Sequence, residues 1–244
     1  MERDLAYGSV LLGAVATGTW WHLDTDPGFF VHTLVLYALL VALVLWRAPE
    51  VVAGTPLGPA NRLTLLRAIL IAPVAALTLH TGALDPSGYW WIIGVSTVAM
   101  VLDGLDGPVA RRSKTTSRFG ARFDMELDAF LLLALSFLVW LSGQVGAWVI
   151  LIGALRYLFV GASAIWPALR GDLPPSRRRK TVCVMQGVVL LVCLGPVVPA
   201  GLASGLAALA LGLLLYSFAV DVRWLIRPVW RSAGGEGVRD PRMT

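Results

Sequence analysis

The chain has 244 residues, of which 57% are hydrophobic and 14% are charged, and its mean hydropathy is +0.74. Because soluble globular domains carry about 25% charged residues, this composition excludes an ordinary soluble domain and indicates an integral membrane protein. The two cysteines, Cys183 and Cys193, lie in one apolar run, which indicates small core side chains and no disulfide framework. No motif indicates binding of nucleic acid, haem or flavin.

Apolar runs along the chain predict an all-α fold with about eight transmembrane helices, each near the ~20 residues that span a bilayer. The runs cover residues 5–23, 29–46, 63–80, 89–102, 123–141, 145–169, 181–199 and 202–225. The first run has acidic residues beside Arg3 and no clear small-residue cleavage site, so we expect a retained helix and not a signal peptide. The fourth run is short, and it reaches spanning length if its helix continues through Asp103 and Asp106.

Basic residues lie in alternate loops of this predicted bundle. The loops at residues 24–28, 81–88, 142–146 and 195–201 contain no lysine or arginine. By the positive-inside rule, both termini and the loop after the fourth run are cytoplasmic. We therefore expect a bacterial inner (plasma) membrane protein with a polar, disordered tail at residues 229–244.

Four aspartates gather at the cytoplasmic end of two successive runs. Asp103 and Asp106 are three residues apart, and Asp124 and Asp128 are four residues apart, so each pair shares one face of a helix. Two antiparallel helices can bring the pairs together, where the carboxylates would repel one another. A single aspartate of this kind is commonly a helix cap or an ion-pair partner, but four together indicate a site for divalent cations such as Mg²⁺, which binds carboxylates and substrate phosphates.

The residues between the two aspartate pairs carry a second signal. Gly107, Ala110 and Gly120 are small, so they allow a ligand, or simply another helix, to approach the backbone closely. Arg111 is suited to bind a phosphate group. Metal ligands, small residues and an arginine together indicate a phosphate-bearing substrate, and a nucleotide diphosphate fits best.

At every fixed position, the chain resembles the signature of the CDP-alcohol phosphotransferase (CDP-alcohol phosphatidyltransferase) family, in the pattern Asp103-x2-Asp106-Gly107-x2-Ala110-Arg111-x8-Gly120-x3-Asp124-x3-Asp128. The helix pattern extends the resemblance over about residues 61–224. It implies a core of six helices, which we place at residues 51–228, preceded by an extra helix pair at residues 1–50.

Two shorter stretches also resemble the family. The sequence NRLTLLR contains Asn61, Thr64 and Arg67, as in the first core helix of family members, although Asn61 and Thr64 could equally serve as helix caps. The sequence RRRKTVCVMQ, which includes Arg179 and Lys180, is similar to a stretch of phosphatidylglycerophosphate synthases. Its alternative interpretation is a basic charge at the membrane surface.

The resemblance implies an enzyme that joins a CDP-linked donor to an alcohol acceptor, releases CMP, uses two divalent cations (Mg²⁺ or Mn²⁺) and pairs as a homodimer. It implies that Asp103, Asp106 and Asp124 are metal ligands, and that Asp128 is both a metal ligand and the general base. It also implies a CDP site lined by Gly107, Ala110, Arg111, Gly120, Asn61 and Thr64. We expect CDP-diacylglycerol as donor, with its lipid tail between helices among the membrane lipids.

One departure from the family leaves the acceptor open. Many members that use phosphorylated acceptors have a lysine or arginine directly after the last aspartate of the signature, where this chain has Ala129. Arg156, inside an apolar run, together with Arg179 and Lys180, could bind an acceptor phosphate, although Arg156 could instead pair with an aspartate of the signature.

Two other functions stay open at this stage. One is an enzyme that uses a CDP-linked polyol and makes a soluble phosphodiester. The other is a non-catalytic membrane protein, such as a divalent-cation carrier, which would more typically need charged residues near the bilayer midplane. The three histidines are scattered along the sequence at predicted outer helix ends, and we expect His22, His32 and His80 to be non-catalytic.

Overall fold

The structure is a computed structural model that describes residues 2–47, 59–80, 82, 84–112, 118–171, 173–174 and 176–233. Within these ranges, the side chains of residues 2–7, 43–47, 59–61, 105–112, 118–122 and 227–233 are not described.

The described residues form eight α-helices and no strand, and each helix corresponds to one of the eight apolar runs, which confirms the all-α prediction. The helices are α1 (Glu2–Leu23), α2 (Gly28–Arg47), α3 (Pro59–Ala76), α4 (Pro86–Arg112), α5 (Arg118–Leu141), α6 (Ile150–Ile165), α7 (Arg177–Leu194) and α8 (Ala200–Ala233). As expected, α4 continues through Asp103 and Asp106. The prediction of one continuous element at residues 145–169 was wrong, because Trp166 leaves the helical conformation and Pro167 begins a separate 3₁₀ turn.

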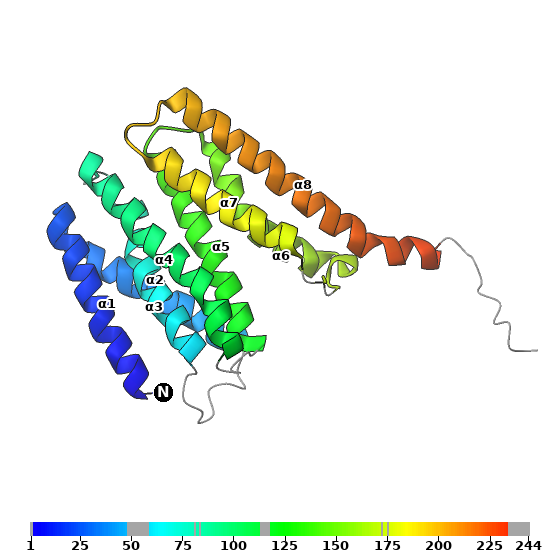
Figure 1. Cartoon of the computed structure of the whole chain (residues 1–244), viewed down its shortest axis with the longest axis horizontal. Helices are drawn as coiled ribbons and strands as arrows, with labels where there is room; N and C mark the ends of the chain where they lie inside the picture. The colour runs from blue at the N-terminus through cyan, green and yellow to red at the C-terminus, as the bar shows by residue number, and fades with distance from the viewer. Residues whose placement is uncertain are drawn as a thin grey trace, which may run out of the picture.

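Three helical segments of the described chain are long and apolar enough to cross a membrane, at Arg62–Leu79, Ala147–Ile165 and Ala200–Ile226. They indicate a membrane protein. The spanning character of the other helices stays a prediction. The last helix, α8, runs past the remaining bundle (Figure 1) and ends at Ala233, beyond the point where the polar tail was predicted to begin.

Helix α3 is the centre of one half of the molecule, where α1, α2, α4 and α5 all pack against it. The second half is built on the pair α7 and α8, with α6 packed between α5 and α8 (Figure 1). A continuous core of buried apolar side chains joins the two halves. Helices α4 and α5 both pack against α3 and against α7. These shared neighbours hold the charged end of α4 close to that of α5.

The extra N-terminal helix pair is joined to α3 by a hydrogen-bonded chain of polar side chains. His80 Nδ1 lies 2.6 Å from Asp26 Oδ2, and His80 Nε2 lies 2.8 Å from His32 Nδ1. The Gly28 backbone N–H and, more weakly, the His80 ring hold the pKa of the Asp26 carboxyl below its usual value. Two of the histidines that are scattered in the sequence are therefore together in the structure, and their contacts connect α2 with the end of α3.

Helices α5 and α6 cross closely at Gly153. A Cβ atom added there would lie 2.6 Å from the backbone nitrogen of Leu133 and 2.7 Å from Ser136 Oγ. We expect Gly153→Ala to lower the free energy of unfolding by about 1–3 kcal/mol, because backbone cannot move aside as a side chain can. Thermal unfolding of the purified protein in detergent measures this loss.

The control for this prediction is Gly187→Ala. The added Cβ would meet the flexible end of the Met100 side chain, with Cε at 2.5 Å, so a rotation of Met100 relieves the contact. Equal losses of stability in the Gly153 and Gly187 variants would contradict the close crossing of α5 and α6.

Candidate metal and phosphate site

Three helices bring four charged side chains together at one end of the bundle. Helix α3 supplies Arg67, α4 supplies Asp103, and α5 supplies Asp124 and Asp128. The two residues on α5 are one helical turn apart, so their side chains lie side by side. The predicted convergence of carboxylates from two successive helices is confirmed for these three aspartates, and it occurs around a side chain of a third helix.

Arg67 is completely buried and contacts all three carboxylates. Its Nη1 lies 2.8 Å from Asp103 Oδ1 and also donates to Asp124 Oδ1, while its Nη2 donates to Asp128 Oδ1 at 2.5 Å. Its Nε donates to the Ala99 carbonyl oxygen at 3.2 Å. The planar guanidinium is thus fixed from both ends, which is the geometry that makes arginine suited to several acceptors at once.

The three carboxylates suit a divalent cation. One oxygen from each of Asp103, Asp124 and Asp128 lies within 4.8 Å of the others. Their side chains are 27%, 36% and 28% exposed, whereas Arg67 is 0% exposed. Solvent therefore reaches the carboxylates although the guanidinium is closed off from it. Oxygen donors with excess negative charge are the ligand set that Mg²⁺ and Mn²⁺ prefer.

Several predicted site residues have side chains outside the described part of the chain, although their backbones lie on α3, α4 or α5. They are Asn61, Asp106, Gly107, Ala110, Arg111 and Gly120. Thr64 is described: it is buried on α3, one turn before Arg67, so it faces the same end of the bundle.

Arg156 has a partner that the sequence did not indicate. Its Nη2 donates to Glu126 Oε1 at 2.8 Å, while its Nε is buried without a hydrogen-bond partner among the described residues. The suggested pairing of Arg156 with an aspartate of the signature is thus replaced by a pairing with Glu126, which lies between Asp124 and Asp128 on α5. The second positive group, on α6, is therefore held against α5, the helix that carries two of the carboxylates, with donor capacity left over.

The basic start of α7 is tied to α8. Arg178 donates to Asp221 Oδ1 and, at 2.9 Å, to the Ser217 carbonyl oxygen. Arg179 Nη1 lies 3.5 Å from Asp221 Oδ1, and Lys180 is exposed on the same turn. These contacts give the arginines a role in joining α7 to α8, beside the acceptor-binding role predicted for Arg179 and Lys180.

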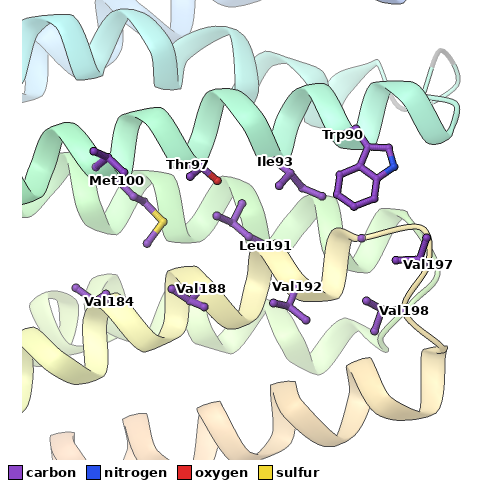
Figure 2. A pocket seen from close by; sticks show the side chains of 12 residues that line it. Trp90, Ile93, Thr97, Met100, Val184, Val188, Leu191, Val192, Val197 and Val198 are labelled. Atoms are coloured by element: carbon purple, nitrogen blue, oxygen red, sulfur yellow. The ribbon is translucent and has the colours of Figure 1, made fainter.

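An apolar groove of about 560 Å³ runs between α4 and α7 (Figure 2). Its α4 wall extends from Met100, one helical turn from Asp103, to Trp90, and its α7 wall includes Val184 and Val188. The α4 wall is about ten residues long, or roughly 15 Å at the helical rise. The groove therefore begins on α4 about one helical turn from Asp103 and extends along this helix toward Trp90.

Sequence reasoning noted Arg67 in the stretch NRLTLLR but gave it no role in the site, and it did not predict the pairing of Glu126. Arg67 was available as a signal, since it is the charged residue within the apolar run 63–80, and a charge inside such a run points to function or to a buried partner. Arg111, Arg112 and Arg122 are near enough in sequence to supply ion pairs for the aspartates, but their side chains lie outside the described part.

One of the comparisons with known proteins gives a match, and this match includes the site. No curated protein and no solved structure is significantly similar to the chain. The family model described as CDP-alcohol phosphatidyltransferase matches residues 57–218, which is more than half of the chain and contains Arg67, the acidic cluster and Arg156. With the resemblance of the aspartate signature confirmed over this whole region, the chain belongs to the CDP-alcohol phosphatidyltransferase family.

Proposed function

We propose that the chain is a membrane enzyme of phospholipid synthesis that transfers a phosphatidyl group from CDP-diacylglycerol to a hydroxyl acceptor and releases CMP. The observation that carries this proposal is that the apolar groove reaches Met100 and Val101 on α4, within one helical turn of Asp103. A donor with a charged diphosphate and a hydrocarbon tail matches a helix, α4, that carries Asp103 of the acidic cluster one turn from Met100 of the groove.

In the proposed reaction, the acceptor oxygen forms a bond to the phosphorus that carries diacylglycerol. The bond between this phosphorus and the bridging oxygen breaks, and CMP leaves with that oxygen. Asp128 takes the proton of the acceptor hydroxyl, for which an exposed carboxylate edge is suitable. Divalent cations held by Asp103, Asp106, Asp124 and Asp128 would neutralise the charge on the phosphate oxygens.

The groove favours a lipid-linked donor over a CDP-linked polyol. Its lining is apolar apart from Thr97, and a polyol would gain nothing from such a surface. The groove's length of roughly 15 Å is close to half of the ~30 Å hydrocarbon core. An acyl chain of the donor is therefore the occupant we propose.

The acceptor class depends on Arg156. A phosphorylated acceptor, as used by phosphatidylglycerophosphate synthases, would need positive charge that Ala129 does not supply. The Nε of Arg156 is a buried donor without a partner among the described residues, and a phosphate oxygen would satisfy it. This unsatisfied donor, with Arg179 and Lys180 as further candidates, supports a phosphorylated acceptor. The ion pair of Arg156 with Glu126 neutralises part of the positive charge and supports a neutral acceptor.

The test of the proposed function is CMP release by purified protein with Mg²⁺ or Mn²⁺, CDP-diacylglycerol and a panel of acceptors. The panel contains glycerol-3-phosphate, serine, inositol, inositol phosphate and phosphatidylglycerol. Release that depends on one acceptor, with a product that extracts into organic solvent, supports the proposal. A water-soluble product from a CDP-polyol would contradict it, and cation uptake into liposomes without CDP-lipid would indicate a carrier.

The role of the groove gives a separate prediction. We expect Val188→Trp, which fills the groove from α7, to lower kcat/KM for long-chain CDP-diacylglycerol roughly tenfold or more. A short-chain donor should be affected much less, because its chains do not extend along the groove. The matched control is Leu209→Trp on the exposed apolar face of α8, and equal effects of the two variants would contradict the acyl-chain assignment.

A further inference from the structure

The guanidinium of Arg67 lies within the carboxylate cluster and pairs with all three aspartates. We propose that Arg67 is a positioning residue that holds Asp103, Asp124 and Asp128 together before a divalent cation binds, so that the metal-free site is already folded. This inference rests on the proposed function, since it concerns the metal-dependent site of that function, but it assigns a role in the metal-free protein.

The three carboxylates need a counter-ion. Three carboxylate oxygens within 4.8 Å of one another repel strongly when no cation lies between them. Arg67 meets this need with two nitrogens, Nη1 and Nη2, that reach the Oδ1 atoms of all three aspartates. A lysine could not do this, because its single ammonium is a point charge and not a planar fork.

The guanidinium of Arg67 is held in place and cannot reach solvent. It is 0% exposed and its Nε is held by the Ala99 carbonyl oxygen. A buried guanidinium that loses its carboxylates leaves an uncompensated charge, and the converse holds for the carboxylates. The pairing is therefore a permanent part of this end of the bundle, with the helices α3, α4 and α5 joined through one side chain.

A divalent cation and Arg67 can bind the same carboxylates through different oxygens. Each ion pair uses an Oδ1 atom, and each aspartate has a second oxygen and a partly exposed side chain. Three carboxylates and one guanidinium leave a net charge of −2, which is the charge that one divalent cation neutralises. Loss of Arg67 should therefore be compensated in part by a bound cation.

The test measures the melting temperature of wild-type protein and of Arg67→Gln, each in EDTA and in saturating Mn²⁺. In EDTA we expect Arg67→Gln to melt roughly 10 °C lower than wild type. In Mn²⁺ this deficit should shrink to less than half, because the cation replaces the missing positive charge. The matched control is Arg156→Gln, an ion-paired arginine outside the three-aspartate cluster, whose loss should be the same in both buffers.

Equal deficits of Arg67→Gln in EDTA and in Mn²⁺ would overturn the inference, since Arg67 would then serve packing alone. If Arg67→Gln does not fold in EDTA, folding on addition of Mn²⁺ supports the inference, and a variant unfolded in both buffers overturns it. The proposed function is judged separately by CMP release. A metal-rescued variant of an inactive protein would leave the inference standing and remove the function.

Discussion

Replacing Asp128 by asparagine is expected to lower the rate of CMP release by at least about a hundredfold, and by up to about 10⁴-fold. Asparagine has nearly the shape of aspartate and keeps an oxygen that can accept from Arg67 Nη2, which lies 2.5 Å from Asp128 Oδ1. It cannot take a proton from the acceptor hydroxyl. The variant should therefore fold and bind CDP while turnover is lost, and CMP release and CDP binding are the two measurements.

The control is Asp221→Asn, the same change at another buried carboxylate that is paired with arginines. Asp221 joins α8 to Arg178 and Arg179, so its loss should lower stability while the protein that remains folded stays active. Normal turnover in Asp128→Asn would remove the general-base assignment. Loss of CDP binding in the same variant would instead place Asp128 in donor binding.

Much of the fold was predictable because each helix is determined by the residues of its own segment. A continuous apolar run has to become a helix in a membrane, where the backbone finds no other partner, and all eight runs did so. The spacing of Asp124 and Asp128 is also local, since residues four apart share a helix face in any helix. The same reasoning correctly carried α4 through Asp103.

The part of the site that the sequence did not predict depends on tertiary contacts. Arg67 is separated from Asp124 by 57 residues, and nothing local indicates that α3 presents it to α4 and α5. Arg67 can pair with all three carboxylates because it is buried, where no water competes for its guanidinium. The contact of His32 with His80, 48 residues apart, was hidden for the same reason.

Removal of a single metal ligand gives the second large effect. We expect Asp124→Ala to lower metal-dependent CMP release by more than about a thousandfold, since a metal ion contributes several kcal/mol to a phosphoryl-transfer transition state. EDTA should abolish the activity of the wild-type protein in the same assay. Activity of the variant, or of wild type in EDTA, at the normal rate would contradict the metal assignment.

The stability of Asp124→Ala should move in the opposite direction to its activity. Without Asp124, Arg67 still pairs with Asp103 and Asp128, and the net charge of the cluster falls from −2 to −1. We therefore expect an unchanged or higher melting temperature in EDTA, because like charges gathered for function repel one another, and a smaller gain on adding Mn²⁺. The charge change is opposite in Arg67→Gln, so the two variants should differ in sign in EDTA. A large loss of stability in Asp124→Ala would mean that packing of this side chain, and not its charge, governs the end of the bundle.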